Sequence, residues 1–371
     1  MAAETLSPRA LNRATLARQL LLERSDMPVL DAVEHLVGLQ AQVPLTPYTA
    51  LWSRLEGFRP EALAGLVLER RAVRIAVMRA TIHLVSADDC LALRPLMQPV
   101  LDAELARHPE FSPHLRGVDL GPALDVARHL LAQGPLSQAE IRSAMQERFP
   151  DLHAGALAYA CRCLLALVQV PPRGVWGRAG QVRSTTAESW LGRPLGAEPS
   201  IDAAVLRYLG AFGPATAADV ATWCRLTRLR PVLERLRPGL RTFRDGRGRE
   251  LFDLPDAPRP DADVPAPPRF LPEYDNALLS HADRGRFVSD EHRARLPWFT
   301  GGDVGPVLVD GSVRAVWRLE RERSSGAATL AITHAGIPRR AATAVAAEGR
   351  RLLDLVAADA ESREVRLVTA P

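Results

Sequence analysis

The sequence predicts an α+β fold made of three successive winged-helix units and a C-terminal β-rich domain. Before residue 256, helical patterns followed by two short strand patterns occur three times, which is the element order of a winged helix. Residues 256–268 then carry five prolines and indicate a linker between domains. Beyond this linker, Asp310-Gly311 between two β-branched runs gives the strongest hairpin signal in the chain.

The first unit, residues 7–118, is expected to contain helices and a two-stranded ribbon. Apolar residues at helical spacing predict helices over residues 11–22, 28–39, 47–55 and 60–69. The last two of these begin with proline at a plausible first-turn position. Residues 73–76 and 81–85 then predict short strands that are joined around Met78-Arg79.

The second unit, residues 119–198, repeats this order. Helices are expected over residues 123–131, 141–149 and 154–167, the last in the place of a recognition helix. Ser137 and Glu140 have the spacing of a capping box at the start of the middle helix. Strands at residues 168–170 and 181–184, joined by a proline-rich turn, predict the wing.

The third unit, residues 199–256, has the clearest pattern. Helices are expected over residues 203–213, from a cap-like start at Thr216, and over 229–236. Residues 240–243 and 250–254 predict a hairpin with a Gly-rich tip, and Arg247 at this tip is well placed to contact a backbone phosphate.

The C-terminal domain, residues 257–371 with the linker, is expected to be rich in strands. Residues 307–309, 313–319, 327–333 and 365–368 predict strands, and residues 339–358 predict an amphipathic helix between the last two.

The composition excludes several classes of enzyme. The chain has 371 residues, a hydrophobic content of 47% and a net charge of +4, and all 47 of its basic residues are arginine. A GC-rich genome is a sufficient cause of that bias. Without lysine, no side-chain amine forms a Schiff base, which excludes lysine-dependent lyases, aldolases, pyridoxal enzymes and P-loop NTPases. Arginine remains well suited to phosphates and guanine edges.

The cysteines indicate a reduced interior. Cys90, Cys161, Cys163 and Cys224 are too scattered for a disulfide framework. Cys161 and Cys163 have no second Cys/His pair at zinc-ligand spacing, so we expect no metal and no cofactor. No apolar run is long enough to span a bilayer, and no export pattern starts the chain. We therefore expect a cytoplasmic protein that binds no membrane.

Gln40-Ala41-Gln42 is the motif that is most informative about chemistry. It ends an apolar run and precedes Pro44. Carboxamides do not titrate near neutral pH, but they can hold a water or a leaving group in a fixed orientation. Two helical residues at this spacing would point about 200° apart. Because Pro44 keeps its neighbour out of the helical region, we expect the pair to straddle the helix end and face one side. The alternative is that both glutamines cap the preceding helix.

Several separated motifs resemble a bacterial family of winged-helix DNA-binding proteins, in the same order and over residues 11–367. This family includes the AlkZ-like and YcaQ-like DNA glycosylases. The matching stretches are Met78-Arg79-Ala80-Thr81-Ile82-His83-Leu84, Leu271-Pro272-Glu273-Tyr274-Asp275-Asn276, Ser280-His281-Ala282-Asp283-Arg284, and Asp310-Gly311 with Trp317-Arg318. Gln40-Ala41-Gln42 is similar to the Gln-x-Gln of the AlkZ-like branch, where the YcaQ-like branch carries Gln-x-Asp.

The resemblance implies tandem winged helices and a C-terminal β-barrel that form a C-shaped clamp around duplex DNA. It implies a monofunctional DNA glycosylase of base excision repair, without lyase activity, that removes N7-alkylated guanine. Bulky adducts and interstrand crosslinks are included, often as self-resistance in antibiotic producers. The partner is then double-stranded DNA, and the protein is expected to be monomeric and nucleoid-associated. An N7-alkylated guanine is already a good leaving group, so Gln40 and Gln42 need only direct water and deoxyribose.

The resemblance also supplies candidate DNA-binding residues. They are Arg79, His83, Arg247, Tyr274, Asp275, Asn276, His281, Arg284 and Trp317. Each has a structural alternative: the histidines as core residues, Tyr274 and Asp275 as packing and turn residues, the arginines as ion-pair partners, and the tryptophans as core. Because only 5% of residues are aromatic, we expect no stacked pocket for an extruded base.

The competing class of function is not enzymatic. Tandem winged helices are also typical of a transcriptional regulator, or of a DNA-damage binder without turnover. The expected helices at residues 154–167 and 229–236 are rich in Leu and Ala, with few positions that can read bases, and Gln40-Ala41-Gln42 lies outside both.

Overall fold

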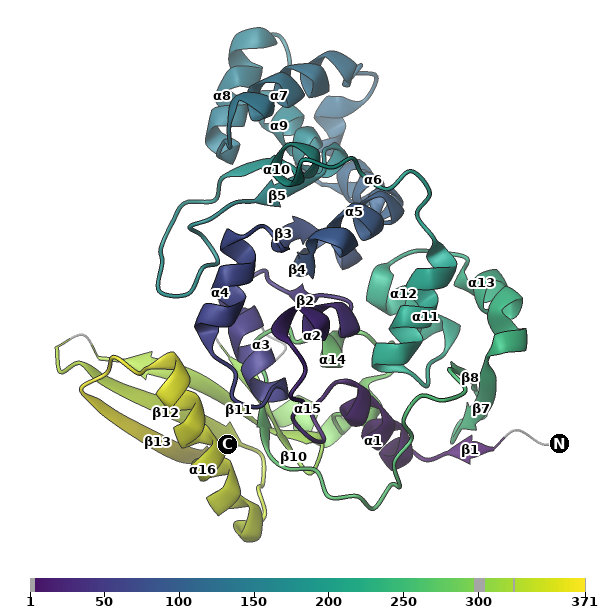
Figure 1. The fold of residues 1–371 in the computed structure, drawn as a ribbon, viewed down its shortest axis with the longest axis vertical. Helices are drawn as coiled ribbons and strands as arrows, with labels where there is room; N and C mark the ends of the chain where they lie inside the picture. The colour runs from purple at the N-terminus through teal and green to yellow at the C-terminus, as the bar shows by residue number, and fades with distance from the viewer. Residues whose placement is uncertain (1–3, 297–303, 323, 371) are drawn as a thin grey trace.

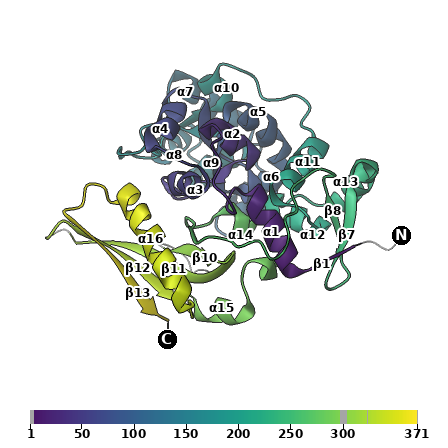
Figure 2. The same cartoon turned by 60° about the horizontal axis from the view of Figure 1, so that its bottom comes forward.

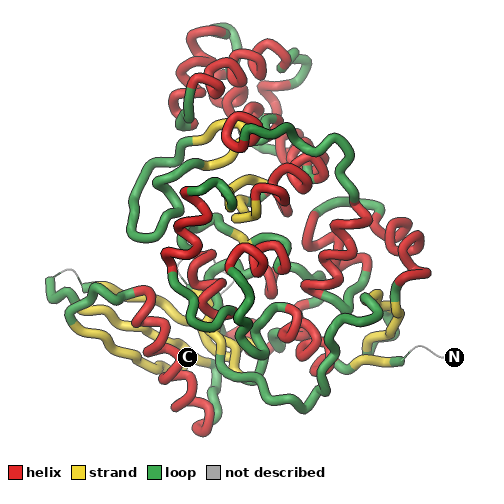
Figure 3. Tube along the Cα trace, in the orientation of Figure 1, coloured by secondary structure: helices red, strands yellow, loops and turns green. Residues whose placement is uncertain are grey.

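The computed structural model describes residues 4–296, 304–322 and 324–370, and it has a mixed α+β fold (Figure 1). Three sheets are found in this part of the chain. Their strand orders are β1-β7-β8, β2-β4-β3-β5-β6 and β13-β12-β11-β10-β9. Most of the helices gather around the second sheet and above it, whereas the third sheet stands to one side with one long helix on it (Figure 3).

All four of the expected N-terminal helices are present, although the bounds of the first two differ by several residues from those expected. They are α1 (Pro8–Arg18), α2 (Val29–His35), α3 (Thr46–Arg54) and α4 (Pro60–Leu68). Two further helices, α5 (Ala87–Leu96) and α6 (Gln98–Arg107), have no counterpart in the expected pattern. Each of these contains proline, at Pro95 and at the start of α6, which weakens the sequence signal of a helix.

The prediction of a helix through residue 39 was wrong. α2 ends at His35, the backbone then turns through Val37 and Gly38 with φ of 54° and 84°, and Leu39–Gln40 form the short strand β2. A Cβ at Gly38 would lie 2.7 Å from Val85 Cγ1. Only glycine therefore lets β2 approach its neighbour this closely. As a result, Gln40 belongs to a sheet and not to the end of a helix.

The central sheet joins strands of the first two expected units. β3 (Ala72–Ala76) and β4 (Ile82–Ser86) form a hairpin, β2 pairs with β4, and β3 pairs with β5 (Leu167–Gln169). β6 (Ser184–Thr186) pairs with β5 and forms the edge of the sheet opposite β2. The strands that were expected to form two separate wings therefore belong to one continuous sheet, which crosses the expected boundary between units at residue 118. The domain boundaries themselves stay a prediction.

Three helices form a separate bundle at the top of Figure 1. They are α7 (Gly121–Gln133), α8 (Gln138–Arg148) and α9 (Ala154–Leu164), and they enclose a core of their own. The capping box of Ser137 and Glu140 is confirmed. The helix expected over residues 154–167 stops at Leu164, because the chain there enters β5. The short helix α10 (Ala187–Leu191) follows β6.

The third expected unit is found with small shifts of its bounds. Its helices are α11 (Ile201–Phe212), α12 (Ala217–Cys224) and α13 (Leu229–Leu236), and Thr216 caps α12 as expected. β7 (Arg241–Asp245) and β8 (Glu250–Asp253) form the hairpin. β1 (Thr5–Leu6), near the N-terminus, pairs parallel with β7, a long-range contact that local patterns do not reveal.

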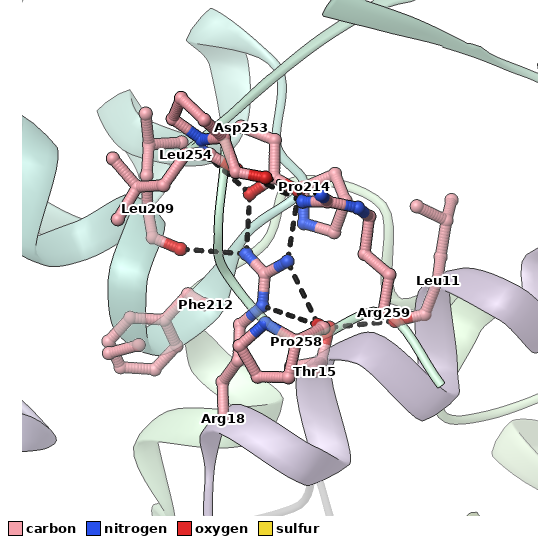
Figure 4. A network of polar contacts seen from close by, with 12 residues as sticks. Leu11, Thr15, Arg18, Leu209, Phe212, Pro214, Asp253, Leu254, Pro258 and Arg259 are labelled. Atoms are coloured by element: carbon pink, nitrogen blue, oxygen red, sulfur yellow. Dashed lines mark hydrogen bonds and ion pairs between the residues drawn. The ribbon is translucent and has the colours of Figure 1, made fainter. Parts of the chain in front are cut away.

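A buried ion pair ties α1 to this unit and to the linker (Figure 4). Arg18 donates to both carboxylate oxygens of Asp253 at 2.6 and 2.9 Å, and neither side chain is exposed. Arg259 donates to the same carboxylate at 2.6 Å. Arg18 also donates to the carbonyl of Pro258. The linker at residues 256–268 is therefore held against α1 although it forms no helix or strand.

The C-terminal strands form an open sheet with one helix. They are β9 (Arg269–Phe270), β10 (Gly305–Val309), β11 (Ser312–Arg321), β12 (Ala327–His334) and β13 (Ser362–Thr369). α16 (Arg339–Val356) connects β12 to β13 and covers one face, which lets these two strands run parallel (Figure 2). The short helices α14 (Asn276–Leu279) and α15 (Asp290–Arg295) precede β10.

The expected barrel is wrong. β13 and β9 are opposite edges of the sheet, and no pairing between them closes it within the described residues. The physical reason is that the α16 crossover leaves β13 beside β12 at one edge, while the two-residue β9 ends the other. The fold class is therefore α+β without a closed barrel, and the clamp stays a prediction.

Candidate active site

Gln40 lies in β2, where an arginine holds its carboxamide oxygen. β2 pairs antiparallel with β4 and sets Gln40 opposite His83. The Gln40 residue is 9% exposed, and its Oε1 accepts a 2.6 Å hydrogen bond from Arg79 Nη2. A guanidinium only donates, so the atom that faces Arg79 is the oxygen, and Nε2 is directed elsewhere.

Gln42 is held in a similar way by the backbone. It is exposed just beyond β2, and its Oε1 accepts a 3.3 Å hydrogen bond from the N–H of Ile82. Ala41, between the two glutamines, donates to the carbonyl of Ile82 at 2.8 Å. Residues i and i+2 of an extended chain project to the same side. The alternative in which both glutamines cap α2 is wrong, because α2 ends at His35 and its last carbonyls accept hydrogen bonds from the backbone N–H groups of residues 36–38.

Arg79 is the centre of this group of contacts. Its Nη1 donates to the carbonyl of Trp223 at 3.1 Å, and its Nη2 donates to Asn276 Oδ1 at 2.8 Å as well as to Gln40. These acceptors are all neutral. Burial, together with the charges of nearby arginines, lowers the pKa of Arg79 to about 10, so the side chain is a cation at neutral pH. Such a cation favours an anion nearby.

His83 supports Arg79 from below the surface. Its ring is 0% exposed. Nδ1 lies 3.0 Å from the carbonyl of Thr81, and because a carbonyl only accepts, Nδ1 carries the proton and donates to it. The unprotonated Nε2 then accepts a hydrogen bond from Arg79 Nη2 at 3.3 Å. Burial, together with the charge of Arg79, lowers the pKa of His83 to about 3. The expected DNA contact of His83 does not fit a buried ring, and its position is that of a core histidine.

The segment at residues 274–276 brings a distant part of the sequence to this site. Asn276 is buried, and its Nδ2 donates to the carbonyl of Gly38 at 3.2 Å. Asp275 caps α14 and accepts hydrogen bonds from Arg54 at 2.8 and 2.9 Å, also in the interior. The expected DNA contacts of both side chains are contradicted by this burial. They instead fix the segment against β2.

Tyr274 differs from its neighbours. It is 40% exposed, and its backbone has a φ of 57°, in the left-handed region that few tyrosines adopt. The buried contacts of Asp275 and Asn276 hold it in this conformation. Tyr274 is thus the residue of the segment whose side chain a DNA ligand can reach.

His281 is a core residue, which corrects the expected DNA-facing role. It is 1% exposed, its Nε2 lies 2.9 Å from the carbonyl of Phe212, and aromatic rings surround it. Burial lowers the pKa of His281 to about 4. The polar residues around it in the sequence suggested a loop at the surface, but the loop packs its histidine inward.

Arg247 and Arg284 line a wide hollow of about 890 Å³ that also includes Arg249 and Arg293. Arg247 and Arg249 both pair with Asp283, at 3.2 and 2.8 Å. Burial lowers the pKa of Arg284, and the charge of Arg293 lowers it further. Several arginines around one hollow are suited to a phosphate backbone, and this role of Arg247 and Arg284 remains a prediction.

Trp317 is half-buried on β11. Its indole N–H donates to the carbonyl of Leu271 at 2.8 Å, which fixes the ring against the sheet. One part of the ring remains accessible in a groove beside residues 43–46. Its expected role as a DNA contact remains a prediction.

Arg74, which holds the middle of the Gln40-Ala41-Gln42 motif, was not among the expected site residues. Arg74 Nη2 donates to the carbonyl of Ala41 at 2.8 Å, whereas its Nε and Nη1 have no partner in the described part of the chain. Burial lowers the pKa of Arg74 to about 10. A signal was present, because Arg74 is the one charged residue in the apolar strand Ala72–Ala76. Together, Gln40, Gln42, Arg79, His83 and Asn276 come from three separate segments and meet at one place.

Two further properties of the described chain concern metals and membranes. Within residues 4–296, 304–322 and 324–370, no group of three or more His, Cys, Asp or Glu side chains is arranged to hold a metal ion. In the same residues, no helix combines the length and the apolar character that crossing a membrane requires.

Comparisons with known proteins agree on one family. A family model described as "DNA glycosylase AlkZ-like" matches residues 33–355. The structure is similar to that of Streptomyces sahachiroi DNA glycosylase AlkZ, with a TM-score of 0.77 and 22% sequence identity over 98% of this chain and 100% of that chain. At this identity the likeness shows the fold. No curated protein matches the sequence.

Proposed function

This chain belongs to the AlkZ-like DNA glycosylase family, and from this premise we propose that it is a monofunctional glycosylase of N7-alkylated guanine. The observation that carries the proposal is the fixed orientation of Gln40 and Gln42. Both carboxamide oxygens accept hydrogen bonds from protein donors, so the two amide groups cannot rotate freely. We assign the chain to the Gln-x-Gln branch of the family.

The reaction requires no general acid: the oxygen of water bonds to C1′ while the C1′–N9 bond breaks, the base leaves with the electron pair, and the water loses one proton to solvent. Alkylation at N7 places a positive charge on guanine, which makes the base a good leaving group without a general acid. Two requirements remain: a water near C1′ and stabilisation of a cationic sugar. A carboxamide suits the first, because Nε2 donates to the water while the oxygen keeps a second lone pair for a water proton. Positioning of this kind contributes several kcal/mol when bulk water is excluded.

Arg79 adds an electrostatic element to this mechanism. A charge-assisted hydrogen bond to Gln40 Oε1 is stronger than a neutral one and polarises the amide, so that its N–H groups become better donors. The cation also attracts a DNA phosphate, which brings the deoxyribose close to the two glutamines. His83 and Asn276 act through Arg79 and are positioning residues.

Several finer points belong to the same proposal. Bulky adducts and interstrand crosslinks are included among the substrates, and self-resistance of an antibiotic producer is the corresponding biological role. Lyase activity is absent because the sequence contains no lysine to attack the sugar. The protein acts as a monomeric clamp on duplex DNA, in the cytoplasm at the nucleoid.

The alternative function, a transcriptional regulator, would require α9 or α13 to read base edges, and both helices are poorly suited to that role. Most of α9 is buried within its bundle. On α13, Arg230 pairs with Glu234 and Glu250, and Arg235 pairs with Asp202. Arginines that are already paired in this way are poorly available to base edges.

The test is excision from a duplex that contains one N7-methylguanine. Wild-type protein is expected to leave an abasic site that mild alkali cleaves on a denaturing gel. Gln40→Ala and Gln42→Ala are each expected to slow excision roughly 100-fold, the effect of removing one oriented polar group. Gln133→Ala, at an exposed position of α7, is the matched control and should excise at the wild-type rate.

A wild-type rate in both motif variants would overturn the assignment of the glutamines. Binding to a single palindromic sequence with intact DNA would instead favour a regulator. Binding to lesion-containing DNA without an abasic product would favour a passive damage binder.

A further inference from the structure

Arg74 is the charged residue of a buried strand, and its hydrogen bond goes to the Gln40-Ala41-Gln42 motif. Strand β3 is buried along its whole length, and Arg74 itself is 2% exposed. Its Nη2 donates to the carbonyl of Ala41 at 2.8 Å, whereas Nε and Nη1 find no acceptor among the described residues. A buried guanidinium with so few partners lowers the stability of the fold. Groups that are costly in this way are concentrated at functional sites.

No carboxylate in the described part of the chain neutralises Arg74. The register of β3 and β5 places the neutral Gln169 opposite Arg74, and the buried Oε1 of Gln169 also lacks a partner in the described residues. The titratable groups that act on Arg74 are Tyr48, whose pKa burial raises, and Arg173, a second cation. The carbonyl of Ala41 is therefore the polar group that stabilises this charge.

The contact fixes the peptide group between the two glutamines. The carbonyl of Ala41 and the N–H of Gln42 belong to one planar trans peptide, so they point in opposite directions. Ala41 is also held by β4, because its own N–H donates to the carbonyl of Ile82 at 2.8 Å. A charge-assisted hydrogen bond to the carbonyl polarises this peptide, which makes the N–H of Gln42 a stronger donor.

The loop that follows β5 packs against the guanidinium at Gly174. A Cβ at Gly174 would lie 2.8 Å from Arg74 Cδ, and the φ of 83° also favours glycine. Tyr48 holds this part of the loop, because its hydroxyl donates to the carbonyl of Gly174 and accepts from the N–H of Trp176, both at 3.0 Å. Gly177 of the same loop has a φ of 68°, but a Cβ there would meet nothing within 4 Å.

We propose that Arg74 is a positioning residue of base excision, which orients the peptide between Gln40 and Gln42 through the carbonyl of Ala41. This inference rests on the proposed function, because it requires the two glutamines to act on the deoxyribose. What the site needs at this place is a cation that donates. Loss of the cation should lower the maximal rate of excision and leave the affinity for duplex DNA unchanged, because a side chain that is 2% exposed reaches no phosphate.

The experiment measures single-turnover excision of N7-methylguanine from about pH 5.5 to about pH 8.5. Arg74→Met should lower the maximal rate about 10- to 100-fold at every pH. Burial lowers the pKa of an ammonium more readily than that of a guanidinium. Arg74→Lys should therefore excise faster than Arg74→Met at about pH 5.5, where the lysine is protonated, and lose this advantage as the pH rises. A structural role alone would lower the rate of both variants without a pH dependence.

Gly174→Ala tests the same role without removing the charge. The added methyl group must displace Arg74, so the maximal rate should fall about tenfold. Gly177→Ala is the matched control, because it carries the same backbone strain without this contact and should keep the wild-type rate. The comparison of the two glycine variants decides the matter if Arg74→Met does not fold.

The outcomes separate this inference from the proposed function. A wild-type maximal rate in Arg74→Met, equal rates of Arg74→Lys and Arg74→Met at every pH, or equal rates of the two glycine variants would overturn the role of Arg74. The proposed function stands in each of these cases if wild-type protein excises N7-methylguanine and Gln40→Ala does not. If wild-type protein leaves N7-methylguanine in place, the proposed function fails and this inference fails with it.

Discussion

The guanidinium of Arg79 donates to Gln40 Oε1 at 2.6 Å from a backbone whose φ of 58° lies in the left-handed region. A non-glycine residue in this region costs free energy, and surrounding contacts must hold it there. Here the contacts are those of the candidate site itself, because Trp223, Asn276 and His83 all meet the same guanidinium. The strained residue and the motif are thus parts of one arrangement.

Arg79→Lys is expected to slow excision of N7-methylguanine by about 10- to 100-fold. The lysine keeps the charge, but it has no planar fork that reaches Gln40 and Asn276 together. Gln40 then rotates, so the maximal single-turnover rate should fall more than the affinity for duplex DNA. Arg142→Lys, at an exposed position of α8, is the control. An unchanged maximal rate would show that Gln40 needs no such support.

The rate of excision is expected to be independent of pH between about 5 and 9. The pKa of His83 is lowered to about 3 and that of Arg79 to about 10, so neither group titrates in this window. The carboxamides of Gln40 and Gln42 do not titrate at all. The measurement is the single-turnover rate across this range. A limb near pH 6.5 that disappears in His83→Asn would contradict the assignment of a neutral, buried imidazole.

Stability is expected to fall as the pH drops below about 6.5, because two histidines are buried without charge. The pKa values of His83 and His281 are lowered from 6.5 to about 3 and about 4. Between each lowered pKa and 6.5, the unfolded chain binds more protons than the folded one, so acid favours unfolding. The contribution of these histidines to stability is therefore fully present above pH 6.5 and is lost as the pH falls. Each histidine accounts for up to about 1.4 kcal/mol per pH unit.

Urea unfolding at several pH values between about 7 and 5 measures this slope. His281→Asn should flatten it whatever the variant's absolute stability, whereas His129→Asn, at an exposed position of α7, should not. Equal slopes in wild type and His281→Asn would mean that the folded protein accepts the proton on His281.

Asp253→Ala is expected to lower the free energy of unfolding by about 3–5 kcal/mol. The substitution leaves the buried guanidinium of Arg18 without its carboxylate and releases Arg259 (Figure 4). Chemical unfolding measures the loss. Asp354→Ala, which breaks the exposed pair with Arg363, should change stability by less than about 1 kcal/mol. Similar losses in both variants would show that burial adds nothing to the Arg18–Asp253 pair.

Arg247→Ala is expected to weaken binding to undamaged duplex DNA and to reduce the slope of log K against log salt by about one. Arg247 is exposed at the tip of the β7–β8 hairpin and lines the hollow with Arg284. Fluorescence anisotropy over a range of salt concentrations gives the slope, with Arg142→Ala as the control. An unchanged slope would place the DNA backbone away from this hairpin.

Local patterns predicted most of the elements, because helix caps, helical spacing and hairpin turns act over a few residues. The capping box at Ser137 and the bounds of α13 are examples. The errors arise where distant contacts decide. Gly38 looked like part of a helix, but its approach to Val85 makes it a turn, and β1 forms only because β7 is available. Burial of His281 also depends on Phe212, which lies far away in the sequence.

By itself, the sequence determined the α+β class, the resemblance to one family and the residue types of the site, because spacing and side-chain chemistry are properties of the chain. Tertiary structure alone decided that Gln40 lies in a strand, that Arg79 joins Gln40 to Asn276, that His83 and His281 are buried, and that the C-terminal sheet stays open. The reason is physical: the orientation of a carboxamide and the charge of an imidazole depend on neighbours that only folding brings into contact.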